Sequence, residues 1–121
     1  MTVTQANVGS VIRAAIPELS NDVKENEDLY HLTFWSIFDW TAQAVREGNR
    51  GNLVRAIELI DAIFLDCDAY VRNAVTVSFL EYVHPEDKVG REIFDALTPE
   101  LRRQWHLLGE YLDNLRNRKN V

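Results

Sequence analysis

The stretch DAYVRNAVTVSFLEYV, Asp68–Val83, decides the fold of this 121-residue chain. At 100° per residue, one face of a helix over this stretch is mostly apolar and carries Val71, Ala74, Val75, Ser78, Phe79 and Tyr82. More apolar residues fall on its other sides, and after the first residue, Asp68, only Arg72 and Glu81 are charged. A helix that is apolar nearly all round is a buried one. The stretch therefore predicts a central helix with neighbours on several sides.

Helical periodicity and end signals predict the other elements. The expected helices cover Thr4–Ala15, Asp28–Glu47, Leu53–Asp66, Val89–Leu97 and a last segment from Thr98 to about Asn117. Asp28, Asn52, Asp68 and Thr98 are the expected N-caps, and Gly48 is the expected end of its helix. The charged segment 18–28 is expected to be a loop with at most one helical turn. The sequence thus predicts an all-α fold, a compact bundle of five or six helices with a central buried helix, in a single domain over residues 1–121.

Composition narrows the class of protein. The chain is 46% hydrophobic and 26% charged, which is ordinary for a globular domain. It has no apolar run near the ~20 residues that span a bilayer, and its first residues do not form a signal peptide. A single cysteine, Cys67, excludes an internal disulfide and fits a reducing cytoplasm. The net charge of −6 argues against nucleic acid as a ligand. We therefore expect a cytoplasmic protein with no membrane contact.

The charge is unevenly distributed along the chain. Residues 1–100 hold 17 acidic and 8 basic residues, a balance of −9, whereas residues 101–121 hold 2 acidic and 5 basic ones, a balance of +3. Such a surface can serve solubility alone. An acidic surface can also raise the rate at which a basic protein partner binds, and it can fix the orientation of that partner.

Catalytic and metal-binding patterns are weak. His31, Cys67, His84 and His106 lie in different predicted helices, without a paired spacing such as CxxC or HxxxH. Glu81-x-x-His84 has the spacing of a di-iron bundle, but those sites need two copies and further glutamates. Cys67 lies on an apolar stripe, where a free cysteine acts as a small hydrophobic residue. The sequence therefore predicts no enzyme, cofactor or metal site, with a small hydrolase or metal protein using Glu81 and His84 as the enzymatic alternative.

Acidic residues are the candidate partner contacts. Glu58, Asp61, Asp66 and Asp68 form the densest acidic cluster, and Glu25, Glu27 and Asp28 form a looser one. Each cluster is either a solvated face, with Asp68 also capping a helix, or a surface for a cationic protein. Asp39 sits among aromatic residues and is either an exposed carboxylate or an acid that holds an Arg or Lys of a partner. Asn73 is either a buried polar tie between helices or part of a binding surface.

A family resemblance adds a specific function. The aromatic helix with Tyr30, Phe34, Phe38 and Trp40, the turn Gly48-Asn49, LVRAIELID (Leu53–Asp61) and VRNAVTVSFLEYV (Val71–Val83) follow in order. This pattern, over roughly residues 28–84, resembles small all-helical bacterial immunity proteins of contact-dependent inhibition and related polymorphic toxin systems. The resemblance implies a cytoplasmic inhibitor that binds a cognate toxin domain, a basic protein such as a nuclease. The matched residues resemble fold determinants, so no binding residue is transferred.

These observations lead to one main hypothesis. The chain is expected to neutralise a toxin domain by stoichiometric binding that occludes its active site or its route to substrate. The expected contacts are Glu58, Asp61, Asp66 and Asp68, with Asp39 as a further candidate. A generic helical adaptor or regulatory subunit is the alternative among binding proteins.

Overall fold

The computed structural model describes residues 2–26 and 30–119, and helices make up most of them. Within those residues there are seven α-helices, two 3-10 helices and no strand beyond one isolated bridge, so the predicted all-α class is confirmed. The elements are α1 (Val8–Ala15), η1 (Pro17–Leu19), α2 (Ser20–Glu25), α3 (Tyr30–Arg46), α4 (Arg50–Leu65), α5 (Ala69–Ser78), η2 (Leu80–Tyr82), α6 (Lys88–Ala96) and α7 (Pro99–Lys119). The predicted count of five or six helices was too low, because segment 18–28 was expected to be a loop.

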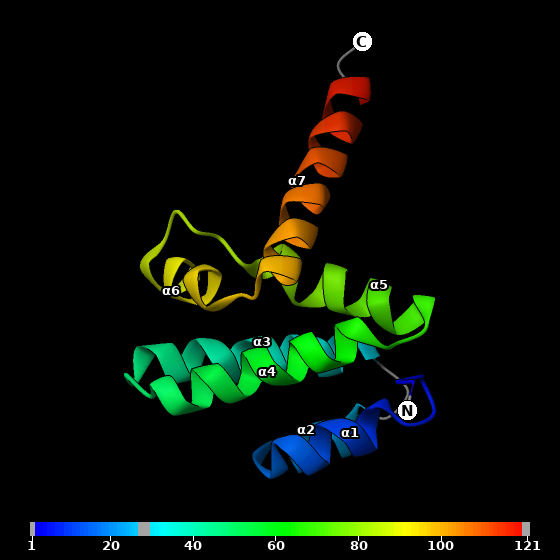
Figure 1. The fold of residues 1–121 in the computed structure, drawn as a ribbon, viewed down its shortest axis with the longest axis vertical. Coiled ribbons are helices and arrows are strands. Elements are labelled where there is room, and N and C mark those ends of the chain that lie inside the picture. The colour runs from blue at the N-terminus through cyan, green and yellow to red at the C-terminus, as the bar shows by residue number, and fades with distance from the viewer. Residues whose placement is uncertain (1, 27–29, 120–121) are drawn as a thin grey trace.

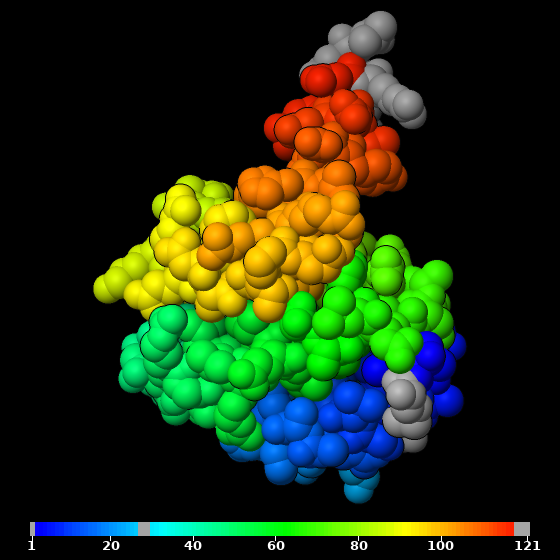
Figure 2. Space-filling view, in the orientation of Figure 1, coloured from blue at the N-terminus to red at the C-terminus, as the bar shows by residue number. Residues whose placement is uncertain are grey.

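The helices lie in layers around the pair α3 and α4 (Figure 1). Helices α1 and α2 cover one side of this pair, α5 and α6 cover the other, and α7 rises away from the body (Figures 1 and 2). Helix α3 packs against α2, α4, α5 and α6. The central position therefore belongs to α3 and α4, and the helix that the sequence placed at the centre, α5, covers one of their faces.

Helix α5 is shorter than expected and is not buried all round. It ends at Ser78, and the chain turns at Phe79 into η2. In an unbroken α-helix, Leu80 would lie about 180° from Val71 and would point away from the core. The turn allows Phe79 and Leu80 both to be fully buried. Burial of Leu80 thus explains why the helix stops before the predicted end at Val83.

The outer side of α5 and η2 also differs from the expectation. Tyr70, Val77 and Tyr82 are exposed, and so is Asn73, which is therefore not a buried tie between helices. Tyr70 and Tyr82 nevertheless touch α3 at their edges, since the Tyr70 ring centre lies 5.7 Å from that of Tyr30 and the Tyr82 ring centre lies 5.7 Å from that of Phe38.

Some of the helix caps and helix ends predicted from the sequence are found in the structure, and others differ. Asp68 caps α5, its Oδ1 accepting from the Val71 amide at 2.8 Å, and Thr98 Oγ1 accepts from the Leu101 amide at 3.3 Å at the start of α7. Both caps confirm the prediction. Gly48, at φ 69°, also ends the turn after α3 as expected. Asn49 and not Asn52 caps α4, since Asn49 Oδ1 accepts from the Asn52 amide at 3.0 Å.

The segment after Pro17 is more ordered than its charge suggests. Leu19 and Val23, four residues apart, are both buried and fix η1 and α2 on the body. The predicted cap Asp28 and the neighbouring acid Glu27 lie outside the described residues. No helix in the described part of the chain is long and apolar enough to span a membrane.

Candidate partner-binding groove

A shallow groove lies between η1 and α2 on one side and α3 on the other, with a volume of about 260 Å³. We call it the tryptophan groove. Its lining residues are Glu18, Leu19, Asp22, Trp35, Ser36, Asp39, Trp40 and Gln43. It is smaller than the ~300–1,000 Å³ of typical small-molecule sites, and it has room for a single side chain.

The α3 side of the groove follows from helical spacing. Trp35, Asp39 and Gln43 recur every four residues and therefore share one face of α3. Trp35 is 44% exposed, an unusual state for so large an apolar side chain. The sequence identified Asp39 as a candidate contact among aromatic residues, and the structure places its side chain on this open face. An indole beside a carboxylate on an open surface suits a cationic side chain.

One acid of the groove is already neutralised within the chain. Arg55 on α4 donates from Nη1 to Glu18 Oε2 at 2.7 Å and from Nη2 to Glu18 Oε1 at 3.0 Å. Its guanidinium also lies 5.5 Å from the centre of the Trp40 ring. The hydrogen bonds from Arg55 lower the pKa of the Glu18 carboxyl to about 2. Glu18 therefore stays ionised, and Arg55 shows within the chain how an arginine pairs with a carboxylate and a tryptophan at this site.

The other two acids of the groove lack such a partner. Within the described residues, the Asp22 and Asp39 carboxylates make no hydrogen bond or ion pair with another side chain. Asp39 is exposed and Asp22 is half-buried. Two uncompensated carboxylates beside an exposed indole leave the groove ready to accept a positive charge from outside.

The four acids of the predicted cluster serve different purposes in the structure. Asp61 Oδ1 accepts from Thr98 Oγ1 at 2.8 Å, which ties α4 to the start of α7. Asp68 caps α5, and Asp66 Oδ1 accepts from Thr2 Oγ1 at 3.0 Å. Glu58 is exposed on the outer face of α4. Three of the four therefore hold the fold together, and they do not line the same site as Asp39.

Sequence reasoning missed Glu18, Asp22 and Trp35. The two acids belong to the segment expected to be a connector, and Glu25 of the looser acidic cluster is exposed on the same α2. A signal was present, because Pro17 followed by Glu18 is a common start of a helical turn, and Leu19 and Val23 have helical spacing.

The enzymatic alternative finds little geometric support. Glu81 and His84 are exposed, and His84 Nδ1 lies 3.6 Å from Glu86 Oε1. Among the described residues, no group of three or more His, Cys, Asp or Glu side chains is arranged to hold a metal ion. The Cys67 thiol is half-buried, and burial raises its pKa, which lowers its reactivity as a nucleophile.

The fold and the groove define a small all-helical protein with an acidic, tryptophan-lined recess. The chain belongs to the family described as Domain of unknown function (DUF7674), whose profile matches residues 10–111. The match contains the whole groove and ends within α7. No curated protein and no solved structure shows significant similarity to the chain.

Proposed function

We propose that this protein is an immunity protein that neutralises a basic toxin domain in the cytoplasm by stoichiometric binding. In this proposal the tryptophan groove receives an arginine or lysine side chain of the toxin. The observation that carries the proposal is the presence, in one groove, of Asp22 and Asp39 without internal partners beside the exposed Trp35. The resemblance of residues 28–84 to immunity proteins supplies the toxin as the partner.

The chemistry of the groove favours arginine. A guanidinium over the Trp35 ring would gain about 0.5–2 kcal/mol from the cation–π interaction. A charge-assisted hydrogen bond to Asp39 would add about 1.5–3 kcal/mol. Arginine can make both contacts at once because its guanidinium is planar and carries several donors. The pairing of Arg55 with Glu18 and Trp40, which line the same groove, is the internal precedent.

The rest of the acidic surface would act at longer range. Residues 1–100 carry a balance of −9, and Glu58 is one of the exposed acids among them. Such a field attracts a basic toxin and raises its association rate, an effect that salt screens. Asp61, Asp66 and Asp68 contribute charge to this field, while their side chains also serve the fold. Binding would then occlude the toxin's active site or its route to substrate.

The proposal predicts a toxin gene immediately upstream of the gene for this chain, and the test uses the C-terminal domain that this upstream gene encodes. Cells expressing that domain should survive when the wild-type chain is co-expressed. The double variant Trp35→Ala/Asp39→Asn should bind at least tenfold more weakly and rescue poorly, because it removes both contacts. Circular dichroism should show an unchanged fold, since both side chains are exposed.

The matched control is Glu92→Gln, which removes an exposed acid from α6, away from the groove. It should bind and rescue like the wild type. A wild-type chain that neither rescues cells nor binds the toxin domain would overturn the immunity proposal. Tight binding to a basic protein without rescue would instead favour the helical adaptor. Rescue that is unaffected in the Trp35→Ala/Asp39→Asn variant would show that the contact lies elsewhere.

A further inference from the structure

Helix α7 carries a regular apolar seam. Leu101, Trp105, Leu108, Leu112 and Leu115 follow one another at spacings of four, three, four and three residues. This is the a/d spacing of a heptad, which places all five on one stripe of the helix. The stripe is the side by which a helix of this kind packs against another helix.

The first part of the seam attaches α7 to the body. Leu101 is fully buried. The Trp105 ring packs edge-on against the Phe94 ring, with 5.0 Å between the two ring centres. Trp105 Nε1 also donates to the Val83 carbonyl at 2.9 Å. Leu108 is half-buried and is the last seam residue packed against the core. These contacts fix the first three turns of α7 on the body.

The second part of the seam has no partner in the described chain. Beyond Leu108 the helix projects from the body (Figures 1 and 2), and every described side chain from Glu110 to Asn117 is exposed. Leu112 and Leu115 are each 36% exposed, and Tyr111 beside them is 60% exposed. Isolated helices of this length are marginal in water. The apolar stripe and the projecting turns would both be stabilised by a second helix.

We propose that a second copy of this chain covers the seam, with the two α7 helices antiparallel and Leu112 of each packed against Leu115 of the other. The α7 helix has 21 residues and is about 31 Å long, so its projecting half offers about three turns for this contact. The proposal is independent of the tryptophan groove, which lies on other helices.

The charge distribution of the chain favours a second copy as the partner of α7 and favours an antiparallel orientation of the two helices. Residues 101–121 carry a balance of +3 and residues 1–100 a balance of −9. Parallel helices would bring two basic C-terminal segments together, whereas antiparallel helices bring each basic segment to the acidic body of the other copy. The two acids of α7, Glu110 and Asp113, fall on the side opposite the seam, so they do not oppose this contact.

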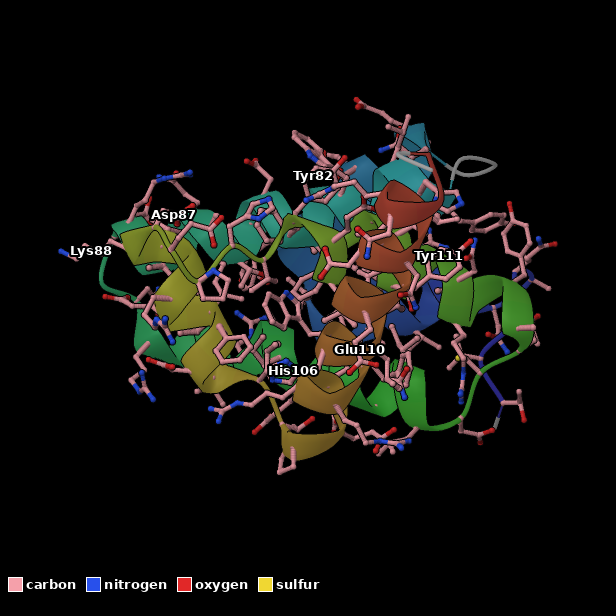
Figure 3. All side chains as sticks on the ribbon, turned by 90° about the horizontal axis from the view of Figure 1, so that it is seen from above. Tyr82, Asp87, Lys88, His106, Glu110 and Tyr111 are labelled. Carbon is pink, nitrogen blue, oxygen red and sulfur yellow. The ribbon has the colours of Figure 1, made fainter. Side chains whose placement is uncertain are left out.

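The body offers a surface where the second copy's helix can end. Helix α7 contacts η2 and α5 near its base, and Figure 3 shows Tyr82 of η2 beside α7, with Tyr111 on the helix itself. An open groove of about 370 Å³ there includes the exposed apolar residues Val77 and Tyr82 and the exposed acid Glu81. Apolar residues with an acidic neighbour complement a helix with an apolar seam and a basic end. A contact limited to about three helical turns and this groove is small for a specific interface, so we expect a concentration-dependent dimer.

The first test is the mass of the full chain in solution. Sedimentation equilibrium from about 1 to 200 µM should show a reversible monomer–dimer equilibrium, with dissociation constants in the micromolar range. Leu112→Glu/Leu115→Glu should associate at least tenfold more weakly than the wild type. Its body should unfold at the same urea concentration. Asp113→Asn, on the opposite side of α7, is the matched control and should dimerise like the wild type. A monomeric wild-type chain at every concentration would overturn the proposal.

The second test is the direction of the helices. In a Cys67→Ser background, Leu112→Cys and Leu115→Cys chains should form a disulfide when mixed and oxidised, because these positions meet across antiparallel helices. Leu115→Cys alone should form far less. Efficient self-crosslinking of Leu115→Cys would indicate parallel helices and would overturn the argument from charge.

Discussion

The hydrogen bond between Asp61 and Thr98 predicts that Asp61 stabilises the fold and is not a free acid available to a partner. Thr98 Oγ1 donates to Asp61 Oδ1 at 2.8 Å and accepts from the Leu101 amide at 3.3 Å, so one hydroxyl both caps α7 and ties it to α4. A hydrogen bond to a charged group contributes about 1.5–3 kcal/mol. Alanine has a higher helix propensity than aspartate by about 0.5 kcal/mol. Asp61→Ala should therefore lower the free energy of unfolding by about 1–2 kcal/mol.

The partner variant and a double-mutant cycle complete this prediction. Thr98→Ala should cost more, about 2.5–4 kcal/mol, because it removes the cap, at about 1 kcal/mol, as well as the bond to Asp61. The double variant should cost less than the sum by about 1.5–3 kcal/mol, the energy of the bond, since either single change already breaks it. Urea unfolding followed by circular dichroism measures all three values. Glu58→Ala, an exposed acid on the same α4, is the matched control and should stay within about 0.5 kcal/mol of the wild type.

Two results would refute this reasoning. Additive losses in the double variant would show that Asp61 and Thr98 do not interact. An Asp61→Ala chain as stable as the Glu58→Ala control would show that Asp61 does not support the fold. Asp61 would then again be a candidate contact for a partner.

Two further predictions concern pH and glycine. The pKa of Glu18 is lowered from 4.5 to about 2, so its ion pair with Arg55 should stabilise the fold fully above pH 4.5 and lose that effect as the pH falls towards 2. In urea titrations between pH 2 and 6, Glu18→Gln should flatten this part of the stability curve, and an unchanged curve would contradict the assignment. Gly90→Ala should destabilise the chain by more than 1 kcal/mol, because a Cβ there would overlap the His84 carbonyl. Gly109→Ala, where a Cβ meets nothing within 4 Å, should instead stabilise α7 by about 0.5–1 kcal/mol, and equal effects at the two glycines would refute the steric argument.

Local signals were enough to predict the helical class and several helix ends. Asp68 and Thr98 cap their helices because a short oxygen-bearing side chain reaches an amide three residues ahead, a contact that neighbouring residues alone determine. The end of α5 could not be predicted in this way. It depends on the burial of Leu80 against other helices, and tertiary packing overrides the local pattern there.

The candidate site could be predicted only in part. Asp39 was identified because it is an acid among aromatic residues of one predicted helix. Glu18 and Asp22 reach the same groove from a segment that precedes α3, and nothing in their local sequence indicates that they face Trp35. The internal roles of Asp61 and Asp66 also depend on distant residues, Thr98 and Thr2. Charge density alone did not separate acids that hold helices together from acids that remain available to a partner.

The N-terminal bridge has a consequence for the order of folding during synthesis. The Val3 amide donates to the Asp66 carbonyl at 2.8 Å, and the Asp68 amide donates to the Val3 carbonyl at 3.0 Å. Val3 is synthesised well before Asp66 and Asp68, so it cannot make these backbone contacts until the chain has grown past residue 68. Until then the buried side chain of Val3 has no place to pack, and the α4–α5 corner is unfinished. Closing a loop of this length is slow compared with forming a helix, so the segment around Val3 should acquire its final structure later than the helices that follow it.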